Sequence, residues 1–199
     1  MSADPDFPRT AEIRSLLDDI KISANLSPRH RDILRLYYGG DTAGVNSLSE
    51  IAQLYGVNVP HAKCMLRDAT IALKSSDLQR LVEAYLKGTE GGRGSAAHEE
   101  NWWAISTVMF MTEKEPERLW QFIVAAYPGL NTERMKAVFA AGPIEDLLSH
   151  HGEQVIDRIE ELALTDDNFR YLLGGVWRAG TPKKIWKRLE NIRGSPWKD

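Results

Sequence analysis

Two groups of polar side chains in the first half of the chain have residue types that could bind phosphate and face a nucleic-acid groove. The first group is Arg29, Arg31 and Arg35, and the second is Asn58, His61, Lys63 and Arg67. Clustered Lys and Arg neutralise phosphates and release the counterions of a duplex, and such contacts position a protein on it. We therefore expect the three arginines to cluster along one side of a helix, and the second group to face the groove or its flanking backbone.

Residues that could support catalysis or hold a metal form no convincing arrangement. The sequence contains no phosphate-binding loop, dinucleotide fingerprint, nucleophile elbow or zinc-protease motif. His150 and His151 are adjacent, but neighbours on a helix point in different directions, and both suit a helix C-terminus. Cys64 has no second cysteine with which to form a disulfide. We expect no catalytic residue, no metal site and no cofactor, and so a protein that is not an enzyme.

The elements that would position the second group are two helices joined by a tight turn. Ser47 and Glu50 have the spacing of a capping box, in which each side chain accepts a hydrogen bond from a free backbone amide. Gly56 suits the left-handed residue that follows a helix end. Asn58 can cap the next helix, with Pro60 in its first turn, where a missing N–H costs little. This spacing is that of a helix-turn-helix, which places its second helix in the DNA major groove.

Neighbouring helices are predicted to support this pair. The arginine group lies on a helix that Ser27 caps and Pro28 opens. Apolar spacing predicts an earlier helix over 10–22 and a later one over 77–86. The inward face of the second helix of the pair is predicted to consist of Ala62, Met65 and Ala69.

A glycine-rich stretch divides the chain. Four glycines fall within residues 87–97, where apolar periodicity is absent, and this composition is typical of a flexible linker. We therefore predict a first domain over 1–87, a linker over 88–98 and a second domain over 99–199.

The second domain is predicted to be helical throughout. Helix starts are expected at about Glu99 and at Pro116, Thr132, Pro143, Val155, Asp166 or Asp167, and Thr181 with Pro182, and breaks at Gly142 and Gly152. No segment has the alternation of a strand. The predicted fold class is all-α, in which a helix-turn-helix domain is joined through the linker to a domain of about six or seven helices.

Composition restricts the location and the charge of the protein. The 199 residues are 43% hydrophobic and 27% charged, with one cysteine and a net charge of −3. No apolar run approaches the ~18 residues of a membrane span, and the N-terminus lacks the features of a secretory signal. We expect a cytoplasmic protein that does not enter a membrane. Residues 1–88 hold 11 Lys and Arg against 11 Asp and Glu, so the helix-turn-helix half is neutral rather than basic.

Residues 26–74 resemble region 4 of the sigma-70 family of bacterial transcription initiation factors. The matching residues are Leu26, Pro28, Arg29, Arg31, Ile33, Leu34, Leu36, Tyr38, Gly39, Leu48, Glu50, Ile51, Gly56, Val57, Ala69 and Leu73. In that family the second helix reads the upstream promoter element, and the domain also docks on RNA polymerase. The resemblance implies double-stranded DNA and RNA polymerase as partners.

The start of the second helix departs from the family pattern. Family members usually have a polar stretch rich in Arg, Glu and Gln there, whereas this chain has Val59, Pro60, His61, Lys63 and Cys64. Losing arginine removes the bidentate guanine contact, the commonest specific base readout. No segment resembles sigma region 2, so we do not expect a complete sigma factor.

Residues 101–191 resemble an uncharacterised bacterial helical domain of unknown function. The resemblance is carried by Trp102, Trp103, the segment 141–148, His151, Gly152, the segment 156–160, Phe169 and the segment 174–177. It implies a shared fold and no activity.

Two functions of different classes follow from these features. The first is a non-enzymatic DNA-binding transcription regulator, whose second domain would bind a partner or form a homodimer. The second is a protein-interaction module of a phage, defence or anti-sigma type, which binds RNA polymerase or another protein without reading DNA. The helix pair favours the first function, and the altered second helix and the neutral charge favour the second.

Overall fold

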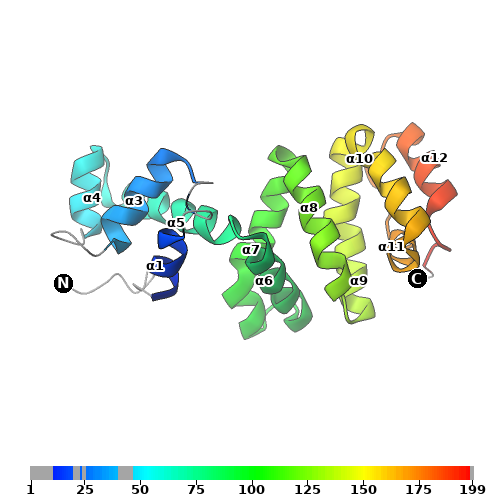
Figure 1. The fold of residues 1–199 in the computed structure, drawn as a ribbon, viewed down its shortest axis with the longest axis horizontal. Coiled ribbons are helices and arrows are strands. Elements are labelled where there is room, and N and C mark those ends of the chain that lie inside the picture. The colour runs from blue at the N-terminus through cyan, green and yellow to red at the C-terminus, as the bar shows by residue number, and fades with distance from the viewer. Residues whose placement is uncertain (1–10, 20–22, 24–25, 40–46, 198–199) are drawn as a thin grey trace. The chain divides into compact units, whose positions relative to one another are not determined.

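The computed structural model describes residues 11–19, 23, 26–39 and 47–197, and every regular element in these ranges is a helix (Figure 1). The prediction of an all-α fold is confirmed. The chain divides into two compact units, residues 1–81 and 82–199, which we call the N-terminal and C-terminal units. Among the described residues, no helix has the length and apolar character needed to cross a membrane.

The N-terminal unit is built around one long helix. Its helices are α1 (Ala11–Asp18), α3 (Pro28–Tyr38), α4 (Leu48–Tyr55) and α5 (Val59–Ser75). Helix α5 packs against α1, α3 and α4, and its inward face consists of Ala62, Leu66, Ala69 and Leu73, all fully buried. Met65, predicted to lie on this face, is only partly buried, because Leu66 takes the inward position.

Local signals in the sequence place the helix ends of the N-terminal unit. Ser27 caps α3 by accepting a hydrogen bond from the His30 amide at 3.2 Å. The capping box is present, since the Ser47 amide donates to Glu50 Oε2 at 2.6 Å and the Glu50 amide donates to Ser47 Oγ at 3.3 Å. Gly56 is left-handed, with φ of 64°. These predictions are confirmed. The predicted helix over 10–22 is described as α1, and residues 10 and 20–22 lie outside the described residues.

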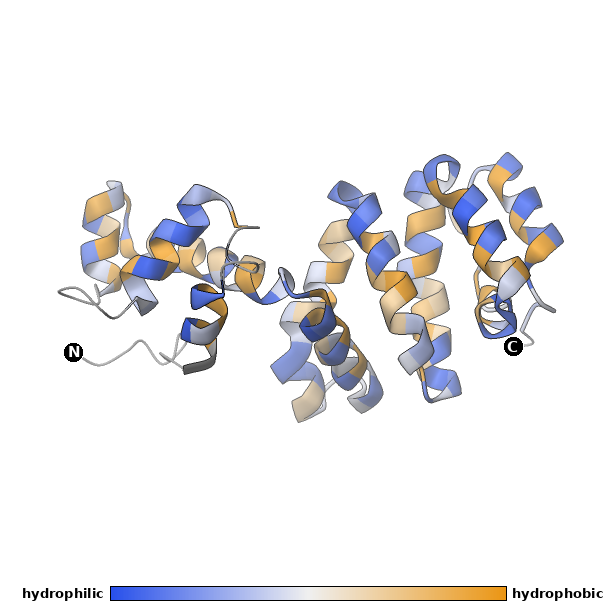
Figure 2. Cartoon of the chain, viewed as in Figure 1, coloured by the Kyte–Doolittle hydropathy of each residue, from blue (hydrophilic) through white to orange (hydrophobic). Residues whose placement is uncertain are grey.

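The C-terminal unit is a stack of helices with its own aromatic core. In chain order they are α6 (Leu78–Gly91), α7 (Ala96–Lys114), α8 (Pro116–Ala126), the 3₁₀ turn η1 (Tyr127–Gly129), α9 (Glu133–Phe139), the π-helical turn η2 (Ala140–Ile144), α10 (Glu145–Thr165), α11 (Asp167–Leu173) and α12 (Lys183–Ile192). Apolar and polar residues alternate along these helices (Figure 2). Tyr85, Phe122 and Phe139 meet edge-on or tilted, with ring centroids 5.0–6.0 Å apart, and burial raises the pKa of Tyr85 to about 12.

Most of the predicted linker over 88–98 is helical. Helix α6 runs through Gly91, and α7 begins at Ala96 after a four-residue turn. The guanidinium of Arg134 donates to the carbonyls of Thr89 and Glu90 at 2.6 and 2.8 Å, and so satisfies acceptors at the end of α6. Gly92 and Gly94 have φ of 75° and 79°, which a glycine adopts without steric cost. The boundary between the units falls within α6 rather than in this stretch.

The two helix breaks predicted at Gly142 and Gly152 have different outcomes. From Glu133 to His150 the chain passes through α9, η2 and the first part of α10 without leaving helical structure. The wider π turn accommodates Pro143, whose ring and missing N–H would disrupt a regular turn. At His151 the helix kinks, with φ of −133° and ψ of 19°, and the imidazole contacts the Thr112 carbonyl at 2.9 Å. The predicted break at Gly142 is therefore wrong, whereas the break predicted at Gly152 is present one residue earlier, as the kink at His151.

Candidate nucleic-acid interface

Helix α5 presents a stripe of exposed residues away from the core of the N-terminal unit. Pro60, Cys64 and Arg67 are exposed and recur at intervals of four and three residues, the spacing of one helix face. Leu66 and Ala69, on the opposite side, are fully buried. The short connection from Gly56 to Asn58 leaves the first turn of α5 open to solvent. This is a helix whose outward face is free to meet another molecule.

Asn58 is committed to the start of α5. Its Oδ1 accepts a hydrogen bond from the His61 amide at 2.9 Å, which satisfies one of the free amides of the first turn. The N-cap prediction is confirmed. The cap uses the side-chain oxygen of Asn58, so only its side-chain NH₂ is left to donate to an outside acceptor.

His61, Lys63 and Arg67 do not share one face of α5. Two residues separated by two positions lie about 200° apart around a helix, so His61 and Lys63 point to opposite flanks. His61 and Arg67 are exposed and Lys63 is half-buried. Arg67 lies 3.6 Å from the carboxylate of Asp68, and both side chains are about 60% exposed; such a pair contributes little. Arg67 is therefore the cation on the outward stripe of α5.

The three arginines of α3 do not all lie along one side of the helix, contrary to the prediction. Arg31 and Arg35 are four positions apart and share a side, whereas Arg29 lies about 200° from Arg31 around the helix. Arg31 donates to the carbonyls of Ser23 and Leu26 at 3.2 and 3.3 Å. Its charge thus holds the chain that leads into α3. Arg29 donates to the sulfur of Met65 at 3.6 Å. Arg35 is exposed and has no side-chain partner among the described residues, which leaves it available for phosphate.

Charged side chains of α3 act on the Tyr55 hydroxyl at the end of α4. The pKa of this hydroxyl is raised, first by burial and then by the negative charge of Asp32, while Arg29 acts in the opposite direction. The surface between α3 and α4 therefore carries charge of both signs.

The tip formed by the end of α4 and the start of α5 is uncharged apart from one residue. Between residues 47 and 62 the only Asp, Glu, Lys or Arg is Glu50. Its carboxylate accepts from the Ser47 amide and hydroxyl, and these bonds lower its pKa. Leu54 and Val59 are 64% and 42% exposed. The tip is therefore suited to apolar contact more than to phosphate.

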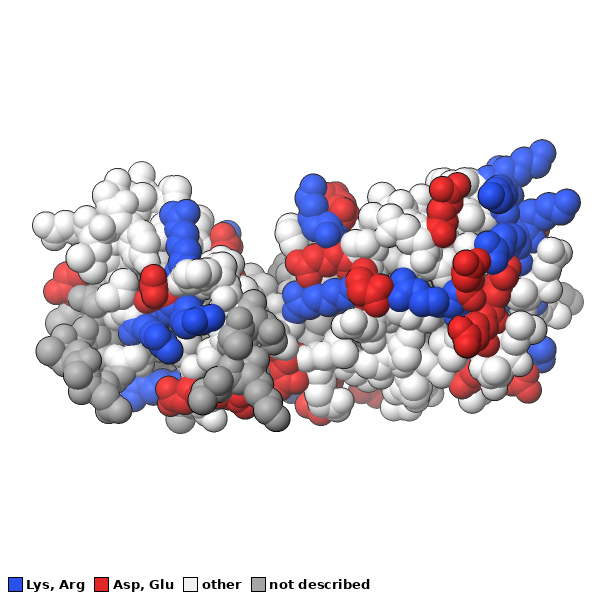
Figure 3. Space-filling view, turned by 45° about the horizontal axis from the view of Figure 1, so that its top comes forward, with Lys and Arg blue, Asp and Glu red and all other residues white. Residues whose placement is uncertain are grey.

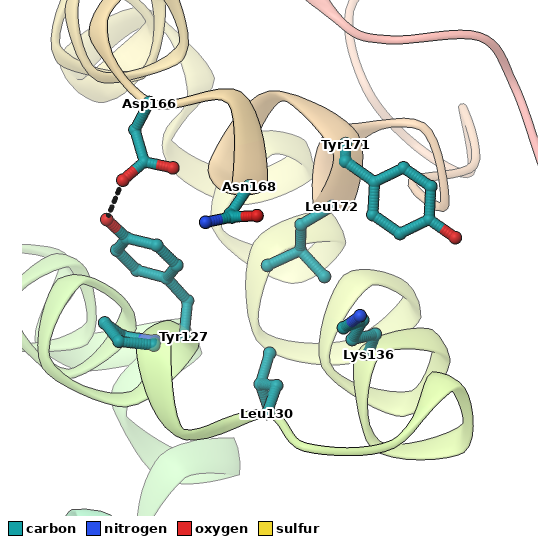
Figure 4. Close-up of a pocket in the computed structure, with 8 residues that line it drawn as sticks. Tyr127, Leu130, Lys136, Asp166, Asn168, Tyr171 and Leu172 are labelled. Atoms are coloured by element: carbon teal, nitrogen blue, oxygen red, sulfur yellow. Dashed lines mark hydrogen bonds between the residues drawn. The ribbon is translucent and has the colours of Figure 1, made fainter.

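The C-terminal unit contains a polar cavity of about 420 Å³ between η1, α9 and α11 (Figure 4). The Tyr127 hydroxyl donates to Asp166 at 2.9 Å, and the Tyr171 hydroxyl donates to Glu133 at 2.9 Å. Burial, followed by the hydrogen bond with Asp166, raises the pKa of Tyr127. Lys136 pairs with Glu133 at 2.7 Å. These groups satisfy one another, and the cavity contains no nucleophile paired with a general base.

The two adjacent histidines are engaged with main-chain carbonyls. Nδ1 of His150 lies 2.9 Å from the Asp146 carbonyl, and Nε2 of His151 lies 2.9 Å from the Thr112 carbonyl. Within the described part of the chain, no group of three His, Cys, Asp or Glu side chains could hold a metal ion. Cys64 is a free, exposed thiol.

Comparison with known proteins finds one family model and two sigma factors, each similar to part of the chain. Residues 92–196 match the model of a family of unknown function (DUF6869). RNA polymerase sigma factor SigA1 of Synechococcus elongatus is 30% identical over 89 residues, which are 44% of this chain and 22% of that protein. RNA polymerase sigma factor SigA of a Nostoc species is 29% identical over 89 residues, 44% of this chain and 23% of that protein.

The match thus covers less than a quarter of the length of either sigma factor. No solved structure matches the chain. Neither the family description nor the two sigma factors indicate an enzyme family.

Proposed function

The chain belongs to a family of unknown function (DUF6869), and from this premise we propose that it is a non-enzymatic transcription regulator with a sigma-like N-terminal unit. We assign the similarity to sigma factors to this unit, as a region 4-like helix-turn-helix. In this proposal α5 enters the major groove of double-stranded DNA, as the second helix of such a pair does.

The observation that carries the proposal is the exposed outward stripe of α5 beside a fixed turn. Helix α4 ends at a left-handed Gly56, and Asn58 caps α5 two residues later. The pair is held by burial of Ile51 and Leu66, so the stripe with Pro60 and Arg67 is presented on a rigid support. A helix held in this way fits a groove without reorganisation of the protein.

Binding in this proposal depends on phosphate contacts more than on base contacts. Arg35 and Arg67 are exposed cations on α3 and α5, and phosphate contacts fix register without reading sequence. Val59 and Pro60 offer no hydrogen-bond donor to a base edge. We therefore expect modest affinity, strong salt dependence and weak discrimination between duplex sequences.

A duplex-binding titration at two salt concentrations tests the proposal. The full chain should bind duplex DNA at low salt, with a log–log salt slope of about −0.9 per phosphate contact. Arg35→Ala and Arg67→Ala should each reduce that slope by about one contact. Arg93→Ala, an exposed arginine of the C-terminal unit, is the matched control. Absence of salt-dependent duplex binding would reject the proposal.

A second candidate function is favoured by the uncharged tip of α4 and α5. The exposed apolar side chains of Leu54 and Val59 suit a protein partner, because desolvating them costs nothing. In this alternative the N-terminal unit docks on RNA polymerase and does not read DNA.

Binding to purified bacterial RNA polymerase separates the two candidates. Leu54→Asn and Val59→Asn, which add no charge, should strongly weaken polymerase binding while leaving the phosphate contacts of Arg35 and Arg67 in place. Leu164→Asn changes an apolar residue that is 77% exposed on α10 and is the control. Polymerase binding that survives both tip variants, or its absence in the unmodified chain, excludes this second function.

A further inference from the structure

Basic residues gather at the C-terminal end of the chain. Residues 178–198 contain seven Lys and Arg and one acidic residue, Glu190, although the whole chain is net negative. In the space-filling view, basic side chains project from the end of the C-terminal unit where α12 lies (Figure 3). Nearly half of the Lys and Arg of the C-terminal unit therefore lie in this one segment.

Only part of this charge is used to hold the fold. Arg188 pairs with Asp157 and Glu160, each at 2.6 Å. Arg193 donates to the Val176 carbonyl at 3.3 Å, and its guanidinium lies 4.7 Å from the centre of the Trp186 ring. These two arginines are structural.

Four other cations have no partner among the described residues. They are Arg178, which precedes α12, and Lys183, Lys184 and Lys187 in its first turns, and all are exposed. Positions three and four apart share one side of a helix, so the three lysines form one face. The buried residues Ile185 and Leu189 lie on the opposite side. This face is held out from the unit with no neighbouring carboxylate bound to it.

A cavity of about 490 Å³ has Arg178 and, from α12, Trp186 in its lining, and much of the lining is aromatic. None of the three lysines of α12 lines it. It is lined by Gly174, Gly175, Trp177, Arg178, Trp186 and Trp197, among others. The Trp177 side chain is 60% exposed, while its main-chain N–H is fixed by a hydrogen bond to Glu145 Oε2 at 3.1 Å. The cavity thus offers an accessible indole beside a free guanidinium.

The opposite wall of the cavity is built by close packing of Trp197. Its indole N–H donates to the Tyr171 carbonyl at 3.1 Å, and its main-chain N–H donates to the Gly174 carbonyl at 3.0 Å. A Cβ at Gly175 would lie 2.6 Å from the Trp197 ring, so the absence of a side chain there permits this contact. The wall is therefore a defined feature of the fold.

We propose that this aromatic-basic surface, defined by Trp177, Arg178, Lys183, Lys184 and Lys187, binds single-stranded nucleic acid. Exposed indoles stack on bases, and lysines follow the phosphates. A duplex hides its base faces within the stack, and an acidic peptide supplies charge without a flat ring. The lysine face extends beyond the cavity, so the surface suits several linked phosphates more than one mononucleotide.

The inference concerns a different unit and a different form of nucleic acid from the proposed function, and it does not depend on that function. A labelled twelve-nucleotide oligo-dT, titrated into the full chain and followed by anisotropy, tests it. Trp177→Ala should weaken binding by about tenfold, and Trp177→Phe should restore most of it. Lys183→Ala, Lys184→Ala and Lys187→Ala combined should reduce the log–log salt slope by about 2.

Matched variants separate this site from other surfaces. Trp102→Ala removes an indole that is 47% exposed on α7, and Lys114→Ala removes an exposed lysine; both should leave binding unchanged. Arg35→Ala and Arg67→Ala should also have no effect, whether or not the chain binds duplex DNA. The proposal is overturned if Trp177→Ala binds the oligonucleotide as tightly as the unmodified chain. It is also overturned if the unmodified chain does not bind the oligonucleotide at low salt. If a mononucleotide displaces the labelled oligonucleotide as well as an unlabelled oligonucleotide does, the ligand is a free nucleotide and the choice of a single strand is overturned.

Discussion

Helix α5 of the N-terminal unit and helix α12 of the C-terminal unit present different chemistry to solvent. Both bury one face completely, through Leu66 on α5 and Leu189 on α12. The exposed stripe of α5 carries one cation, Arg67, with an acidic neighbour. The exposed face of α12 carries three lysines without partners among the described residues. The helix that resembles a DNA reader is thus the less basic of the two.

This difference separates what a scaffold requires from what a partner requires. The residues that carry the sigma-like pattern include Glu50, Ile51, Gly56 and Ala69, which cap, turn or pack the helices. Such residues fix where a helix begins and which side is buried. They leave the outward side chains unconstrained, so the same helix pair can support different partners. The charge on the exposed face is the better guide to nucleic-acid binding.

The largest expected effect is unfolding of one unit while the other unit stays folded. Leu66→Ala should destabilise the N-terminal unit by about 2–5 kcal/mol, because it leaves a cavity at a fully buried site. All six tryptophans lie between residues 102 and 197, so tryptophan fluorescence reports only on the C-terminal unit. During denaturant unfolding of this variant, far-UV circular dichroism should therefore show a transition at low denaturant concentration. Tryptophan fluorescence should not change in that transition.

The converse variant provides the control for independence. Leu147→Ala removes a fully buried side chain of α10 and should shift the fluorescence transition to lower denaturant. If either variant shifts both transitions together, the units unfold as one cooperative structure. The claim that α5 and α12 belong to separately stabilised units would then be rejected.

A smaller effect is expected where α11 meets the C-terminal segment. Gly175→Ala would place a methyl group against the ring of Trp197, and crowding of this kind costs about 1–3 kcal/mol. Thermal unfolding followed by tryptophan fluorescence measures it. Gly142→Ala is the matched control, since nothing lies within 4 Å of its added Cβ. Equal unfolding temperatures for the two variants would show that the Trp197 contact does not hold this wall.

The capping box of α4 should contribute less than either core. Ser47→Ala removes the acceptor for the Glu50 amide and one donor to its carboxylate, a loss of about 1 kcal/mol. Hydrogen exchange at the first amides of α4 would show it as reduced protection. Ser49→Ala, at an exposed position within α4, should change protection by much less. Equal effects would mean that the cap does not determine where α4 begins.

Sequence reasoning located the features that depend on a few neighbouring residues. The caps at Ser27, Ser47, Asn58 and Thr132 are present, and Asp166 rather than Asp167 caps α11. Each of these depends on one side chain and an amide two or three positions away. The all-α fold follows from the same local patterns.

Features that depend on distant contacts were not predictable in this way. Gly152 was expected to end a helix, and the kink falls one residue earlier, at His151. The sequence did not show that a Cβ at Gly152 would lie 2.8 Å from Ile185 of α12, so that the glycine also permits close packing. Arg31 was expected on phosphate, but the backbone before α3 supplies acceptors for it. The cavity beside Trp177 joins residues from three separated segments. The basic run and the tryptophans were visible in the sequence, and only folding brings them together.

The smallest expected effect is a pH dependence in the stability of the first turn of α4, the helix that packs beside α5. Hydrogen bonds from the Ser47 amide and hydroxyl hold the pKa of Glu50 below its ordinary value of 4.5. A carboxyl group whose pKa is lower in the folded state than in the unfolded state stabilises the fold. This stabilisation is complete when the pH is above the unfolded-state pKa, and it is lost as the pH falls through the folded-state pKa. Protection of the first α4 amides should therefore be constant from pH 7 to pH 5 and fall below about pH 4.5. Glu50→Gln should remove this decrease, and Glu113→Gln, on α7, should preserve it. A decrease of the same size in Glu50→Gln would assign the acid sensitivity to another group.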